Sequence, residues 1–77
     1  MEIKLLVTSS INCKLFERRV LEAVEAKGIY AEIEKIDSFP DAKKYGVIYM
    51  PALVVNGKVV SSGKLLSKEE ILRLIFI

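Results

Sequence analysis

The sequence predicts an α/β fold in which the elements follow the order β-α-β-α-β-β-α and form a four-stranded mixed sheet between two helical layers. Three observations predict it. A strand-helix-strand pattern occupies residues 2–37, an Asn-Gly turn joins two β-branched runs within residues 51–63, and a helix cap precedes the apolar run 71–77. The first pattern favours a parallel strand pair with a right-handed crossover, and the second an antiparallel hairpin. We expect a single domain over residues 1–77.

The first strand is expected at residues 2–8, EIKLLVT, and the first helix from Ile11 to Lys27. The apolar run in the strand implies burial on both faces, as a central strand requires. Gly28 follows the helix at the position that commonly ends one. Charged residues cover one side of the helix, and an apolar stripe at spacings of three and four covers the other: Phe16, Val20, Ala23 and Val24.

Residues 29–37, IYAEIEKID, alternate apolar and charged side chains, which indicates a strand with one wetter face near a sheet edge. Residues 38–46 are expected to contain a short helix. Ser38 can cap it, Pro40 suits its first turn, and Gly46 can end it.

The last part of the chain carries the clearest local signals. Asn56-Gly57 accepts the positive φ angles of a two-residue type I′ turn, so residues 51–63 are expected to form a hairpin. Ser67 is expected to cap a final helix, with glutamates at its second and third positions. The buried stripe of this helix is expected at Ile71, Leu74 and Ile75.

Composition excludes several classes of function. The net charge of +2 is spread through the chain with acidic residues interleaved, so we expect no nucleic-acid partner. No apolar run approaches the roughly 20 residues that span a bilayer, and the N-terminus is too short and acidic for a signal peptide, so we expect a cytoplasmic protein without a membrane partner. One Cys and no His exclude an intrachain disulfide, imidazole or multi-thiolate metal sites within one chain and His-based triads, and we expect no cofactor.

The stretch VTSSINCKLFERRV, residues 7–20, holds the only cysteine. If the helix begins near Ile11, Cys13 lies in its first turn, where unpaired backbone N–H groups and the helix dipole favour a thiolate and lower the pKa of the thiol. Ser10, three residues earlier, stands in the capping position at the same end of the helix.

The order of elements and these residues resemble the thioredoxin and glutaredoxin superfamily, and in particular the small single-domain proteins of archaea and bacteria called redox-active disulfide protein 2. The resemblance covers essentially the whole chain. Residues 10–13, Ser-Ile-Asn-Cys, fall on the Cys-x-x-Cys motif of the family, with Cys13 at the second cysteine and Ser10 in place of the first. Met50-Pro51 falls on the cis-proline that faces the motif in the family, and Gly63 on a glycine near the end of its last strand.

The resemblance implies a thioredoxin-like fold and thiol-disulfide exchange at Ser10 and Cys13. In the family the first cysteine attacks a substrate disulfide, and the second then attacks the mixed disulfide and releases the reduced substrate. The resemblance further implies protein disulfides as substrates, an upstream reductase or glutathione as electron donor, and a monomer. The residues that would border the substrate are Ser9, Ile11, Asn12, Met50 and Pro51.

Ser10 departs from the family, because a hydroxyl has a far higher pKa than a thiol and no base is in view to activate it. The chain as it stands should therefore not run the dithiol cycle. Ser10 is either an engineered Cys-to-Ser change or natural, and a near-isosteric change in an otherwise intact motif favours the engineered origin. Two other functions stay open: a redox-inert module that binds peptides or proteins, and a role for Cys13 alone in an intermolecular disulfide or a metal shared by two chains.

Tyr49 and the terminal residues 74–77 each allow two interpretations. Tyr49 either flanks the substrate groove or joins the core, and an aromatic residue before a strand more often does the latter. The terminal LIFI, residues 74–77, either completes the small core or drives dimerisation, and we favour completion of the core.

Overall fold

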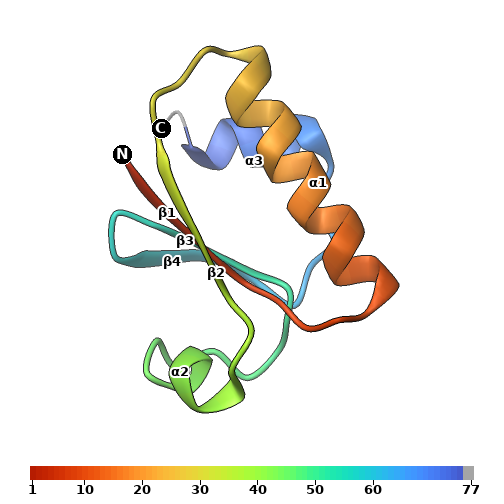
Figure 1. The fold of residues 1–77 in the computed structure, drawn as a ribbon, viewed down its shortest axis with the longest axis vertical. Coiled ribbons are helices and arrows are strands. Elements are labelled where there is room, and N and C mark those ends of the chain that lie inside the picture. Colours follow the sequence, from red (N-terminus) through yellow and green to blue (C-terminus); the bar gives the residue numbers. More distant parts are fainter. Residues whose placement is uncertain (76–77) are drawn as a thin grey trace.

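The computed structural model of the chain describes residues 1–75 and contains the seven elements in the expected order (Figure 1). They are β1 (Glu2–Leu6), α1 (Ile11–Ala26), β2 (Glu32–Ile36), α2 (Phe39–Lys43), β3 (Ala52–Val55), β4 (Lys58–Ser62) and α3 (Lys68–Ile75). The expectations for Phe76 and Ile77, including the fate of the terminal apolar run, lie outside the described residues.

The sheet has the strand order β2-β1-β3-β4, with β1 parallel to β2 and antiparallel to β3, and β3 antiparallel to β4. The sheet is therefore mixed, with apolar β1 inside it and amphipathic β2 at one edge, as the two patterns predicted. The second strand begins at Glu32, later than expected, because the N–H of Ile29 still bonds to the carbonyl of Val24 and so ends α1. The register of β1 with β2 runs as far as Leu6, and one further bond joins Val7 N–H to Ile36 O at 3.0 Å.

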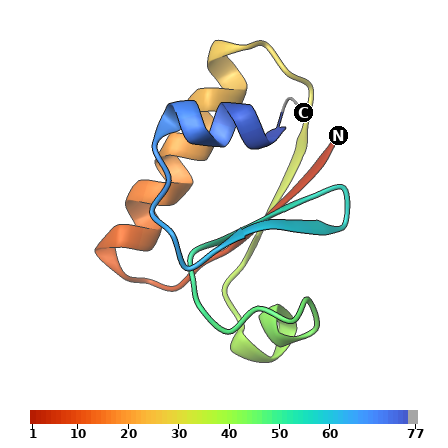
Figure 2. The same ribbon diagram turned by 180° about the vertical axis from the view of Figure 1, so that it is seen from behind.

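Helices cover both faces of the sheet (Figures 1 and 2). α1 and α3 lie on one face, and their apolar side chains pack with Ile3, Leu5 and Val7 into the larger core, which also contains Cys13. α2 lies on the other face, where Ala42 and Val47 pack against Leu6, Ala52 and Val54. The thioredoxin-like α/β architecture is thus confirmed, and it places the end of β1 and the start of α1 beside the larger core.

The termini of the long helices follow their sequence signals. Gly28 N–H bonds to the carbonyl of Glu25 at 3.0 Å and Ile29 N–H to that of Val24 at 3.2 Å, which is the Schellman arrangement. At α3, Ser67 Oγ accepts the N–H of Glu70 and Glu70 Oε1 accepts that of Ser67, both at 3.1 Å, forming a reciprocal capping box.

Other local signals were followed in part. Asn56 and Gly57 have φ angles of 50° and 82°, as a type I′ turn requires. Ser38 occupies the N-cap position of α2, as expected, but its side chain makes no capping bond. Pro40 removes one of the two N–H groups that such a cap could accept, and the bond to the other, that of Asp41, is not formed. In α3, Ile71 and Ile75 are buried while Leu74 is only half-buried.

Candidate functional site

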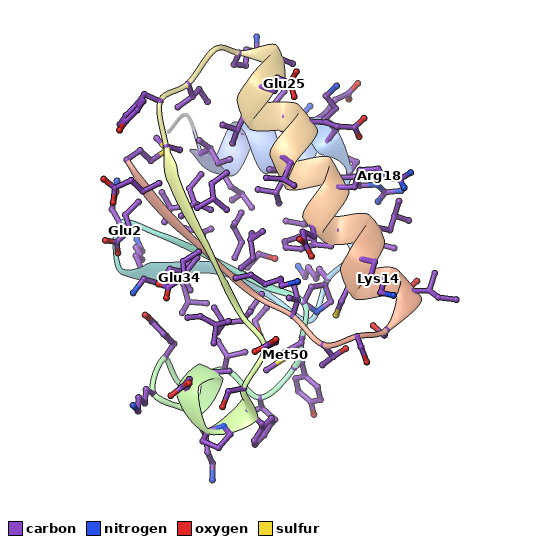
Figure 3. All side chains as sticks on the ribbon, in the orientation of Figure 1. Glu2, Lys14, Arg18, Glu25, Glu34 and Met50 are labelled. Carbon is purple, nitrogen blue, oxygen red and sulfur yellow. The ribbon has the colours of Figure 1, made fainter. Side chains whose placement is uncertain are left out.

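The turn between β1 and α1 places Ser10 at the N-cap of α1, as the sequence predicted. Its backbone is extended, with φ −66° and ψ 158°, and its carbonyl accepts the first helical bond from Lys14 N–H at 3.0 Å. Ser10 Oγ accepts the backbone N–H of Cys13 at 3.2 Å. Lys14, labelled in Figure 3, marks this first turn of the helix. The side-chain oxygen at position 10 therefore lies at the positive end of α1, one hydrogen bond from Cys13.

Cys13 points into the larger core, where only 2% of it is exposed. Its Sγ accepts a hydrogen bond from Thr8 Oγ1 at 3.4 Å, and the same oxygen accepts the N–H of Ser10 at 3.2 Å. Positions 8, 10 and 13 thus form one small hydrogen-bonded group. The burial also works against a role for Cys13 alone between two chains, since the sulfur is recessed below the surface.

The environment of Cys13 shifts its pKa in two opposing directions. Burial is the largest influence and raises the pKa of the thiol, because a charged sulfur loses its hydration there. The Ser10 hydroxyl, the Thr8 hydroxyl and the Thr8 backbone each lower it, because hydrogen bonds favour the charged form. Together these bonds prevail, and the pKa of Cys13 lies below its ordinary value. The hydrogen bonds from Ser10 and Thr8 therefore more than offset the cost that burial imposes on a thiolate at Cys13.

The second part of the site is the segment before β3. The Met50–Pro51 peptide bond is cis, as the resemblance implied, and Pro51 is buried. Met50 is half-buried and packs against both cores, including the one that holds Cys13 (Figure 3). The neighbouring carbonyls are engaged, since Gly63 N–H bonds to Pro51 O at 2.9 Å and Ser62 Oγ to Tyr49 O at 3.0 Å.

Gly63 makes close contact with this segment. It has a φ angle of +74°, and a Cβ at this position would lie 2.8 Å from Tyr49 Cβ. That separation is too short for two carbon atoms, so the path of the chain at Tyr49 depends on a glycine opposite. Tyr49 itself is 71% exposed, so the expectation that it joins the core is wrong.

The remaining candidate residues are exposed around the turn. Ser9, Ile11 and Asn12 are all at the surface, and Ile11 is 83% exposed. Ile48, just before Tyr49, is 71% exposed. Ser10 is hydrogen-bonded to Cys13, whereas Met50 packs against the core cluster that contains Cys13.

Sequence reasoning missed Thr8, which it placed only as the last residue of a strand. The available signal was a hydroxyl residue two positions before the helix cap, where its side chain can accept the N–H of the cap residue. The bond from Thr8 to the sulfur depends on how β1 and α1 pack, which local sequence does not report.

The residues that the structure describes, 1–75, offer neither a metal-binding cluster nor a membrane-spanning helix. In this part of the chain, no group of three or more His, Cys, Asp or Glu side chains could hold a metal ion. Nor does any helix in the same range have the length and apolar character needed to cross a membrane.

The fold and the β1–α1 turn define a thioredoxin-like protein, and comparison with known proteins agrees. The family model described as "Thioredoxin domain" matches residues 1–76. The chain is 36% identical over 75 residues to a protein named thioredoxin from Methanothermobacter thermautotrophicus, with 97% of each chain covered. The chain therefore belongs to the thioredoxin family, and its single cysteine is consistent with an altered active site.

Proposed function

We propose that positions 10 and 13 form the redox pair of a thiol-disulfide oxidoreductase that reduces protein disulfides, and that Ser10 replaces its nucleophilic cysteine. The hydrogen bond from Cys13 N–H to Ser10 Oγ carries this proposal. It places the side-chain atom of residue 10 where backbone N–H groups and the helix dipole would stabilise a thiolate. A sulfur in place of that oxygen would stand beside the residue that has to resolve its mixed disulfide.

The difference in exposure between the two positions supports the same division of roles. Ser10 is exposed, so a sulfur there could meet a disulfide on another protein, while Cys13 is recessed and shielded from foreign disulfides. The lowered pKa of Cys13 increases the fraction present as thiolate, the form that attacks a disulfide sulfur. The order of attack would be position 10 first and position 13 second.

The chain with Ser10 lacks the first step. A serine hydroxyl ionises far above neutral pH, and the hydrogen bond that Ser10 Oγ accepts comes from a backbone N–H, which cannot take its proton. We therefore expect no disulfide reduction by this chain unless a thiol is restored at position 10.

Substrate binding is proposed at the two segments that flank the pair. Within residues 1–75, the hydrogen bonds of the 49–51 segment use the carbonyls of Tyr49 and Pro51 and leave the backbone of Met50 without one. That backbone is free to pair with an extended substrate peptide, as in β-augmentation. Residues 9, 11 and 12 would border the substrate disulfide on the opposite side. The name of the relative, thioredoxin, supports disulfide-bonded proteins as partners.

The proposal extends to the setting of the reaction. The electron donor would be an upstream reductase or glutathione, and the protein would act as a cytoplasmic, single-domain monomer without a cofactor.

The test is reduction of insulin disulfides by dithiothreitol in the presence of the Ser10→Cys variant. We expect this variant to accelerate the reaction while the parent chain does not. A matched control is Lys58→Cys, which adds a second, exposed thiol at the start of β4, at the end of the sheet away from the β1–α1 turn. If Ser10→Cys is no faster than Lys58→Cys, the proposed redox pair is refuted.

A second candidate function is a redox-inert module that keeps the peptide site. The observation that favours it is the combination of Ser10 with exposed apolar side chains next to both site segments, namely Ile11, Ile48 and Tyr49. Its test is an NMR titration of the parent chain with an extended peptide that contains serine in place of cysteine. Shifts centred on Met50, together with an inactive Ser10→Cys variant, would establish it. Absence of binding would remove it.

A further inference from the structure

We propose that Thr8 is a positioning residue for the second half of the exchange, in which its hydroxyl directs a hydrogen bond at Cys13 Sγ and controls the reactivity of that sulfur. This inference rests on the proposed redox function of positions 10 and 13. It assigns a role to a residue outside the Cys-x-x-Cys positions.

The geometry orients the hydroxyl of Thr8. Ser10 N–H donates to Thr8 Oγ1 at 3.2 Å and so occupies one of the lone pairs of that oxygen. The hydroxyl hydrogen is then available to Cys13 Sγ, which lies 3.4 Å away. The preceding residue is fixed as well, because Val7 N–H bonds to Ile36 O at 3.0 Å on the neighbouring strand. The end of β1 and the N-cap of α1 therefore fix the Thr8 hydroxyl within hydrogen-bond distance of Cys13 Sγ.

The Thr8 hydroxyl supplies a hydrogen bond to the Cys13 sulfur, which is shielded from water. Cys13 is 2% exposed, so its thiolate has little hydration of its own. A thiolate is a stronger hydrogen-bond acceptor than a thiol, and a donor aimed at the sulfur therefore favours the charged form. Removing this donor while keeping the burial would take away one of the hydrogen bonds that oppose the effect of burial and so raise the pKa of Cys13.

Charged groups near this hydroxyl are balanced. The small cavity beside Thr8 is lined by Lys14 and Glu17 of α1 and by Lys35 and Asp37 at the end of β2. Lys35 Nζ and Glu17 Oε2 lie 3.9 Å apart, so part of this charge is paired. The pKa of Cys13 is shifted by burial and by the hydrogen bonds of Ser10 and Thr8 rather than by these four charges. The Ser10 hydroxyl, the Thr8 hydroxyl and the Thr8 backbone are the groups that lower the pKa of Cys13.

The step affected is the resolution of the mixed disulfide. With a sulfur at position 10 joined to a substrate sulfur, the Cys13 thiolate attacks the sulfur at position 10. A bond forms between positions 10 and 13, the bond to the substrate breaks, and the substrate leaves as a thiolate that takes a proton from water. The two electrons that reduce the substrate come from the pair. Thr8 acts before this step by favouring the ionised form of Cys13.

The first test needs no redox activity, because the parent chain contains one cysteine. With ¹³C at the cysteine Cβ, its chemical shift against pH reports the ionisation of Cys13 alone. We expect Thr8→Val, which keeps the shape and removes the hydroxyl, to move the midpoint to higher pH. Thr8→Ser should titrate like the parent, and Thr8→Ala should repeat the effect of Thr8→Val. If Thr8→Val titrates at the parent midpoint, the proposal is overturned.

The second test follows release of a fluorescent peptide from its mixed disulfide with the Ser10→Cys variant, with and without Thr8→Val. At neutral pH, every tenfold loss of thiolate should slow release about threefold, because the more basic sulfur that remains is a better nucleophile. Above the midpoint of both proteins, Thr8→Val should therefore be the faster of the two. A slowdown of equal size at every pH would indicate a structural defect and overturn the proposal. If Ser10→Cys itself releases no peptide, the redox function fails, while the ionisation result stands separately.

Discussion

Replacing Gly63 with alanine tests whether the close contact opposite Tyr49 fixes the segment before β3. Two penalties combine there. A side chain at a φ angle of +74° costs roughly 1–2 kcal/mol. The new Cβ would also lie 2.8 Å from Tyr49 Cβ, an overpacked contact that costs about 1–3 kcal/mol once the neighbours shift. We therefore expect Gly63→Ala to lower the free energy of unfolding by roughly 2–5 kcal/mol, from a total on the order of 4–12 kcal/mol for a chain of this size.

The chain supplies a matched control for this prediction. Gly46 has a φ angle of +75°, and a Cβ there would meet nothing within 4 Å. Gly46→Ala therefore carries the backbone penalty alone, about 1–2 kcal/mol. Urea unfolding of both variants isolates the contact with Tyr49 as the difference between their losses. Losses equal to within about 0.5 kcal/mol would refute the reasoning, because they would show that Tyr49 yields freely.

Three further predictions concern stability. Ser67→Ala removes the cap of α3 and should cost about 1 kcal/mol in urea unfolding; no loss would show that the capping box contributes nothing. Hydrogen bonds from the Ser67 backbone and side chain lower the pKa of Glu70, so its stabilising effect is present above the ordinary glutamate pKa and is lost as pH falls through the lower folded value. Glu70→Gln should accordingly lose less stability than the parent between pH 7 and pH 3, and an identical profile would contradict this. Phe16→Ala empties a fully buried site and should cost about 3–5 kcal/mol by thermal unfolding, so a loss below about 1 kcal/mol would contradict the core described.

The fold could be predicted where one local interaction decides the structure. The type I′ turn at Asn56-Gly57 depends on two positive φ angles. The capping box depends on two hydrogen bonds between Ser67 and Glu70, which are three positions apart. Ser38 takes the N-cap position that its sequence signal indicates, but its side chain makes no capping bond to α2. The late start of β2 depends on the end of α1, because the N–H of Ile29 bonds to the carbonyl of Val24 in that helix.

The site could be predicted only in part from the sequence. The N-cap role of Ser10 and the place of Cys13 in the first helical turn follow from residue types at fixed spacing. The bond from Thr8 to the sulfur and the exposure of Tyr49 depend on how distant segments pack, since Tyr49 is held by Gly63 fourteen positions later. Such contacts leave no periodic pattern in the sequence.

The central claim, that positions 10 and 13 form a redox pair, is tested most directly by intact-mass analysis and thiol counting on Ser10→Cys before and after mild oxidation. The account predicts that both thiols disappear, that the mass falls by two hydrogens, and that no dimer forms. Lys58→Cys, treated alike, should not close an internal bridge, because its thiol lies at the other end of the sheet from Cys13. Retention of both thiols in oxidised Ser10→Cys would contradict the claim and leave the peptide-binding function as the better account.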